Sequence, residues 1–180
     1  RLDLAGFLFK AASLGYSAVE LMGKRPHLSV LDYSDAELAE LRGLAESLKI
    51  EIATIAGYTD FTLAAGWEPP AVEMQIAYVG RLAYLGRQLG ARIVRVFTGY
   101  TTQVDAYQRD WDVCVRAIRE CAEIAAEQGV VLGLQNHHDV GVGWEAYGEL
   151  LADIDHPNCR AMLDPWAVAL HGADLYETDR

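Results

Sequence analysis

Residues 128–139 read Gln-Gly-Val-Val-Leu-Gly-Leu-Gln-Asn-His-His-Asp, and this stretch decides the fold. Gly129 follows a helical pattern and is a residue that commonly ends helices. Residues 130–134 are apolar on both alternating faces, which is typical of a strand buried on both sides of a parallel sheet. Polar residues follow at once at 135–139, and such a run makes a poor core. The stretch therefore predicts a buried strand that ends at a polar site.

The same helix-to-strand pattern recurs along the chain at intervals of roughly 30 to 40 residues, a spacing typical of repeated βα units and too long for hairpins. Strands are predicted at 17–22, 51–56, 92–97, 130–134 and 159–163. Helices are predicted around 4–11, 34–48, 72–89, 111–128 and 144–154, with Ser34 as an N-cap, Glu37 as its capping-box partner and Gly15, Gly90 and Gly129 as helix stops.

Apolar strands that alternate with helices indicate a parallel sheet covered on both faces. A doubly wound open sheet would normally carry a glycine-rich phosphate turn, but Gly23 and Gly57 stand alone. A barrel fits the pattern better. Since a complete (β/α)₈ barrel takes about 250 residues, we expect a single, incomplete TIM-barrel domain over 1–180 with about five βα units. Its first strand is expected upstream of Arg1 and its last two beyond Arg180.

The composition bears on the class of partner. A formal net charge of −11 over 180 residues repels a phosphate backbone, and no basic stripe offsets it, so we expect no nucleic acid partner. Charged residues interrupt every apolar run, so we expect no membrane span. Cys114 and Cys121 lie seven residues apart on a helical pattern, which predicts a buried face without a disulfide and fits a reducing cytoplasm. A homo-oligomer is compatible with these features.

In a parallel barrel the chemistry belongs to the carboxyl ends of the strands. Glu20 lies inside an apolar strand, where it can serve the site or form a structural salt bridge. Arg95 alternates with Val94 and Val96, so its guanidinium is expected to face the barrel interior. It can hold a substrate oxygen there, or neutralise Glu20 or Asp164 as a core ion pair.

The densest chemical signal is the polar run after residue 134. Alternation puts the Gln135 amide inside the barrel mouth, and His137 continues that face. In the alternative interpretation, His137 and His138 simply cap a helix or bind water. Asp164 ends the next strand beside Gln135, and Pro165 predicts a loop there that presents the carboxylate. Gln135 and Asp164 offer oxygen donors to a hard divalent ion, although an amide binds a cation less strongly than a carboxylate does.

Several of these stretches resemble the xylose isomerase-like TIM barrels, which include sugar isomerases, sugar epimerases and apurinic endonucleases. The matching stretches are 15–21, 90–96, 132–137 and 163–175, of which the last two are the more specific. In that family a Glu ends the fifth strand and an Asp the sixth, both as metal ligands, and a His and a Glu follow on the last two strands. Here Gln135 replaces the Glu, Asp164 matches the Asp, and Ala167 stands where many members have a His.

The resemblance implies a metal-dependent sugar or sugar-phosphate isomerase or epimerase that moves a proton through an enediolate. It implies a small sugar substrate and a divalent metal: Mn, Mg, Co or Zn. The expected site comprises Gln135 and Asp164 as metal ligands, His137 and Glu20 as catalytic side chains, and Arg95, Asn136, His138 and Trp166 as substrate-binding residues. The principal base is expected beyond residue 180.

Three alternatives stay open. A related dehydratase or lyase shares the same barrel. A degenerate barrel that binds a carbohydrate without turnover is suggested by the departures at Gln135 and Ala167. A nuclease is disfavoured by the negative charge.

Overall fold

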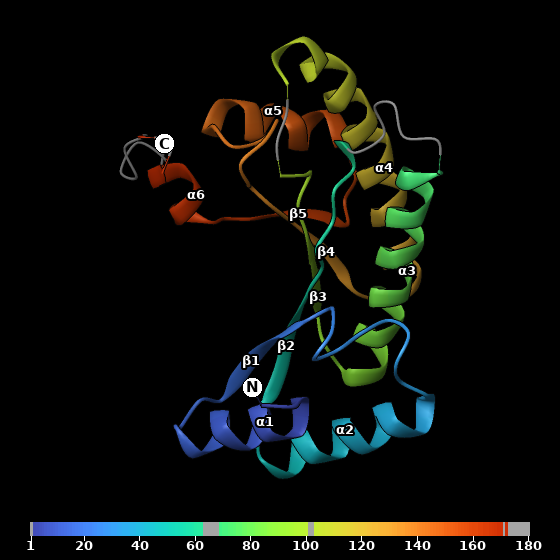
Figure 1. Cartoon of the computed structure of the whole chain (residues 1–180), viewed down its shortest axis with the longest axis vertical. Coiled ribbons are helices and arrows are strands. Elements are labelled where there is room, and N and C mark those ends of the chain that lie inside the picture. The colour runs from blue at the N-terminus through green and yellow to red at the C-terminus, as the bar shows by residue number, and fades with distance from the viewer. Residues whose placement is uncertain (1, 63–68, 101–102, 171, 173–180) are drawn as a thin grey trace.

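A computed structural model of the chain describes residues 2–62, 69–100, 103–170 and 172. Its centre is one parallel sheet in which the strands follow chain order, β1-β2-β3-β4-β5. The strands are β1 (Ala18–Met22), β2 (Glu51–Ala56), β3 (Ile93–Val96), β4 (Val131–Gln135) and β5 (Cys159–Met162), as Figure 1 shows. Each lies within one residue of its predicted bounds. Successive βα units side by side are the partial TIM barrel that the sequence predicts.

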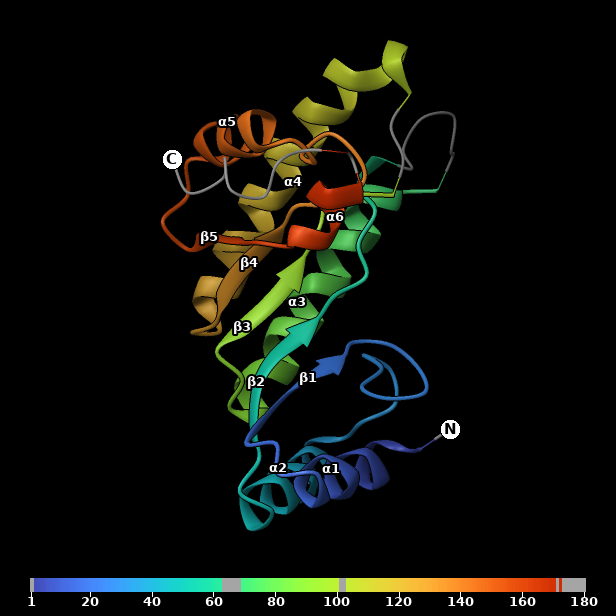
Figure 2. The same cartoon turned by 90° about the vertical axis from the view of Figure 1, so that its left-hand side faces the viewer.

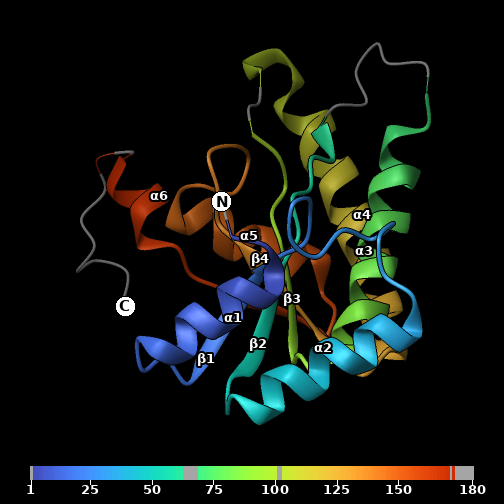
Figure 3. The same ribbon diagram turned by 60° about the horizontal axis from the view of Figure 1, so that its bottom comes forward.

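Helices connect the strands, and all of them except the last cover one face of the sheet. They are α1 (Leu4–Ser13), α2 (Asp35–Ser47), α3 (Ala71–Leu89), α4 (Tyr107–Glu127), α5 (Trp144–Ile154) and α6 (Pro165–Leu170), with a short 3-10 turn η2 (Val104–Ala106) before α4. Figure 2 shows β2 and β3 in front of α3, and Figure 3 shows α6 well apart from α3 and α4. The opposite face of the sheet is therefore the inner face of the barrel.

Local signals in the sequence explain where several helices begin and end. The Ser34 hydroxyl accepts the Glu37 N–H, and the Glu37 carboxylate accepts the Ser34 N–H, which confirms the predicted capping box. Gly90 and Gly129 follow α3 and α4 with φ of 77° and 73°. Residues with a side chain rarely adopt this left-handed conformation, so glycine ends both helices there.

The expectation of a loop at Pro165 was wrong, because Pro165 is the first residue of α6. A proline suits the first position of a helix, where its fixed φ is already helical and its missing N–H would have no helical acceptor. Asp164 directly precedes this helix, and its Oδ1 accepts the Trp166 N–H at 2.9 Å. Asp164 therefore caps α6 and lies two residues after the end of β5.

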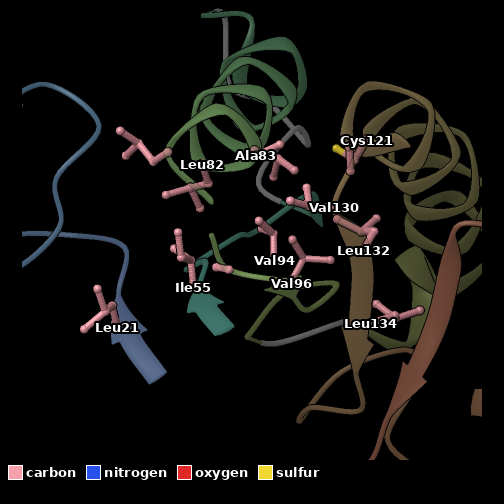
Figure 4. Close-up of a cluster of buried hydrophobic side chains, with 14 of the residues drawn as sticks. Leu21, Ile55, Leu82, Ala83, Val94, Val96, Cys121, Val130, Leu132 and Leu134 are labelled. Carbon is pink, nitrogen blue, oxygen red and sulfur yellow. The ribbon is translucent and has the colours of Figure 1, made fainter. Parts of the chain in front are cut away.

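The apolar core lies between the sheet and the helices, as Figure 4 shows for Val94, Val96 and Leu132. Both valines are fully buried, whereas Arg95 between them points to the inner face, as the alternation predicts. Cys114 and Cys121 are buried free thiols of α4, which confirms the predicted buried face. Within the described ranges, no helix is both long and apolar enough to cross a membrane.

Candidate functional site

Three side chains form a hydrogen-bonded line across the carboxyl ends of β3, β4 and β5. Arg95 pairs with Gly133 in the sheet and Gln135 pairs with Met162, so both side chains rise from the inner face. Arg95 Nη1 donates to Gln135 Oε1 at 2.9 Å, and Gln135 Nε2 donates to Asp164 Oδ2 at 2.6 Å. Asp164 therefore lies beside Gln135 as expected, whereas Arg95 reaches Asp164 through the Gln135 amide and not through a direct ion pair.

The partners on either side determine how the Gln135 amide is oriented. The guanidinium of Arg95 can only donate and the Asp164 carboxylate accepts, so the amide oxygen must face Arg95 and its NH₂ must face Asp164. The Arg95 side chain is 8% exposed, and its Nε has no hydrogen-bond partner among the described residues. A buried N–H without an acceptor is costly. This N–H is also out of contact with solvent, so the part of the chain that the structure describes holds a buried donor without an acceptor beside the cluster.

Asn136 fixes Asp164 through two backbone bonds. Its Nδ2 donates to the Asp164 carbonyl at 2.9 Å, and its Oδ1 accepts the Asp164 N–H at 2.7 Å. Asn136 is only 1% exposed. Both ends of its amide are thus occupied, so within the described residues Asn136 positions Asp164.

His137 is held as a neutral imidazole with a defined tautomer. Its Nδ1 lies 2.8 Å from the Gly99 carbonyl oxygen, which only accepts hydrogen bonds, so Nδ1 carries the proton and Nε2 keeps its lone pair. The ring stacks on Phe97 at 4.2 Å and 9°, with the Tyr100 ring edge-on at 5.3 Å. Burial lowers the pKa of His137. His137 is therefore a base at neutral pH.

The remaining predicted residues lie farther out. His138 is exposed, with its ring 4.4 Å from that of His137. Trp166 is 69% exposed on α6. Glu20 is exposed on β1. Following the paired residues from strand to strand across the sheet, Glu20 corresponds to Val131 on β4. Val131 lies four residues before Gln135, a distance of roughly 13 Å along the strand. The structure does not bring Glu20 to the cluster.

Two cationic side chains contact an aromatic ring next to the cluster. The sequence did not predict these contacts. The Lys24 ammonium lies 3.4 Å from the centre of the Tyr58 ring, and the Arg95 guanidinium carbon lies 5.4 Å from the same centre. A cavity of about 620 Å³ borders Lys24 at the end of β1. Lys24 and Tyr58 each come two residues after a strand, so the sequence places both near the carboxyl edge of the sheet. It does not predict that they contact each other.

The described residues do not by themselves fit a divalent metal site. The Gln135 oxygen is bonded to Arg95, and its N–H groups face Asp164, so the pair does not turn two oxygens toward one cation. Asp164 is the one carboxylate donor of the cluster. Across the described part of the chain, no three His, Cys, Asp or Glu side chains are grouped to hold a metal.

The parallel barrel sheet and the polar groups at its carboxyl edge define a TIM-barrel protein with its site at the usual end of the strands. The sequence matches the xylose isomerase-like TIM barrel family over residues 8–179, and the chain belongs to that family. The predicted resemblance is therefore confirmed.

A 3-dehydroshikimate dehydratase of Bacillus anthracis is 28% identical to the chain over 162 residues, which are 89% of this chain and 55% of that protein. The solved structure of the probable 3-DHS dehydratase AsbF of Bacillus anthracis is similar with a TM-score of 0.78 at 22% identity, over 99% of this chain and 63% of that one. D-psicose 3-epimerase of Clostridium cellulolyticum H10, solved with D-tagatose, gives 0.80 at 18% identity over 99% and 63%. At these identities the structures show a shared fold. The chain spans about half the length of the curated relative.

Proposed function

We propose that this chain carries the proton-handling part of an enzyme that removes a proton next to a carbonyl group in a small sugar-like molecule. The observation that carries the proposal is the state of His137. Its Nδ1–H is bonded to the Gly99 carbonyl at 2.8 Å, which leaves Nε2 as a base beside the barrel mouth. A half-buried imidazole with a lowered pKa is well suited to accept a proton from carbon near neutral pH.

Arg95 supplies the complementary electrophile. As His137 Nε2 takes the proton, the electrons of the broken C–H bond move toward the carbonyl, and negative charge develops on its oxygen. The guanidinium of Arg95, whose buried Nε–H has no acceptor among the described residues, would donate to that oxygen. Gln135 and Asp164 hold the guanidinium in place through bonds of 2.9 and 2.6 Å, so it need not reorganise during the reaction.

The fate of this enolate defines two candidate activities. In an isomerase or epimerase the proton returns to carbon, at the neighbouring atom or on the opposite face. In a dehydratase the hydroxyl group on the next carbon leaves and takes up the proton as water. The similarity to a 3-dehydroshikimate dehydratase favours the second outcome, as do Lys24 and Arg95 around Tyr58, which suit a substrate with an acidic group.

A divalent metal remains part of the proposal only through Asp164, with its other ligands outside the described residues. Such an ion would supply Lewis-acid polarisation of substrate oxygens. Gln135 does not fit the ligand role as placed, because its oxygen is bonded to Arg95.

The test uses the full-length protein, with and without added Mn²⁺ or Mg²⁺. Incubation in D₂O with a panel of keto-sugars would reveal deuterium exchange by mass spectrometry, and incubation with 3-dehydroshikimate would reveal loss of water. His137→Asn should abolish either activity. His156→Asn is the matched control, because His156 precedes β5 at the opposite end of the barrel and accepts the Asn158 N–H. Binding without exchange or water loss in the unaltered protein would refute the proposal and support a barrel that binds without turnover.

A further inference from the structure

The loops that follow β3 and β4 are joined by two hydrogen bonds between neighbouring residues. His137 Nδ1 donates to the Gly99 carbonyl at 2.8 Å, and Thr98 Oγ1 donates to Asp139 Oδ1 at 2.5 Å. One bond runs from the β4 loop to the β3 loop, and the other runs back. Asp139 therefore holds the residue that directly precedes the acceptor of His137.

Asp139 is an unusual residue to bury for packing alone. It is 8% exposed, and its Oδ2 has no hydrogen-bond partner among the described residues. Burial, together with the nearby Asp60, raises the pKa of its carboxyl group to about 6, although the hydrogen bond from Thr98 acts to lower it. Burying a carboxyl group costs free energy, which indicates a role beyond packing. The hydrogen bond from Thr98 to Asp139 Oδ1 connects this carboxyl group to the residue before Gly99, whose carbonyl binds His137.

Side-chain oxygens lie close to the backbone of Gly99. A Cβ atom at Gly99 would lie 2.8 Å from Thr62 Oγ1, 2.9 Å from Asp60 Oδ1 and 3.0 Å from Asp139 Oδ2. These oxygens surround the Gly99 backbone on one side, and the His137 ring bonds to its carbonyl. The position of that carbonyl is therefore set by the surrounding carboxylates and hydroxyls.

We infer that Asp139 is a positioning residue that, through Thr98, holds the Gly99 carbonyl against His137 Nδ1 and so keeps Nε2 as the unprotonated nitrogen. The inference rests on the proposed function in that His137 is taken as the proton-handling group. Without the bond from Thr98, the Gly99 carbonyl loses its tether, and the imidazole proton can move to Nε2. In that tautomer the nitrogen facing the site is a donor and no longer a base.

The tautomer of His137 can be measured directly by long-range ¹H–¹⁵N NMR of the full-length protein, at a pH where the ring is neutral. The Nδ1–H form should predominate in the unaltered protein. Thr98→Val and Asp139→Ala should shift the population to the Nε2–H form and lower kcat by about tenfold or more, because general-base catalysis needs the free lone pair. Asp139→Asn should retain the Nδ1–H form, since its amide oxygen can still accept the Thr98 hydroxyl.

Thr54→Val is the matched control, because it makes the same change at another buried threonine, one that lies within β2 and not in the loops that carry Thr98 and Asp139. It should leave the tautomer unchanged. Should Asp139→Ala fail to fold, Thr98→Val alone decides the matter. An Nδ1–H tautomer that persists in Thr98→Val would overturn the inference. A tautomer shift in a protein without activity on the tested compounds would uphold it and refute the proposed function instead.

Discussion

Gln135 donates its amide N–H to Asp164 Oδ2 at 2.6 Å while its oxygen accepts from Arg95 at 2.9 Å. A neutral side chain thus links the cation of the cluster to its carboxylate. The cation that faces Asp164 is therefore the Arg95 guanidinium. The Gln135 amide on β4 lies between the two charged groups and is hydrogen-bonded to both.

Gln135→Glu should increase the affinity for Mn²⁺ or Mg²⁺. The change removes the N–H that faces Asp164 and places two carboxylates side by side, and a divalent cation relieves their repulsion. We expect a gain of about tenfold or more, that is about 1.4 kcal/mol, in titration calorimetry of the full-length protein. Asp164→Asn is the companion variant and should weaken binding. Equal or weaker binding by Gln135→Glu would argue against this account of the amide.

Arg95→Met should lower kcat/KM strongly and also destabilise the fold. It leaves the oxygen of the half-buried Gln135 side chain without its donor, which costs about 1–3 kcal/mol in urea unfolding. Arg95→Lys keeps the charge but lacks the planar fork that reaches both Gln135 and a ligand, so it should recover stability better than activity. Full activity in Arg95→Met would remove Arg95 from the proposed mechanism.

The pH profile of kcat/KM should fall on the acid side as His137 takes up a proton. Burial lowers the pKa of His137 from 6.5, so the midpoint of this acid limb should lie below that value. The limb should be absent from any residual activity of His137→Asn. A limb with its midpoint above 6.5 would mean that another group controls the profile.

Asp139 should make the fold less stable as the pH rises from about 4 to about 7. Its pKa in the folded protein is raised from 3.8 to about 6. The neutral carboxyl therefore contributes stability that is fully present below about pH 4 and is lost as the pH passes through about 6. A shift of about two units corresponds to about 3 kcal/mol. Asp139→Asn should flatten this part of the curve in urea unfolding measured from pH 4 to 7; an unchanged slope would assign it to other groups.

Gly99→Ala should destabilise the protein by about 1–3 kcal/mol, because the new methyl group would overlap three oxygens that lie within 3.0 Å of its position. Gly43→Ala is the matched control. Gly43 is exposed within α2, and a methyl group at this position would have no atom within 4 Å, so alanine should stabilise the helix by about 0.5–1 kcal/mol. Thermal unfolding of both variants would compare the two glycines. An unchanged melting temperature in Gly99→Ala would show that the surrounding side-chain oxygens move aside at little cost.

The sequence by itself determined the elements and their order. Residues 51–56 and 144–154 could be assigned without a structure, because apolar periodicity and capping residues act over a few neighbouring positions. Alternation also oriented Arg95 correctly, since successive side chains of a strand must point to opposite faces. Pro165 is the counterexample, because the same residue can end one segment or begin a helix, and local sequence does not choose between them.

Only the tertiary structure decided which side chains meet. Glu20 and Gln135 both end up on the inner face, yet sheet register places them at different levels. The bond between Thr98 and Asp139 spans 41 residues of sequence and depends on how two loops pack above the sheet. Gln135 ends β4, as the change from apolar to polar residues indicated. The partners of those residues lie on other strands, and their distances follow from packing that no local pattern records.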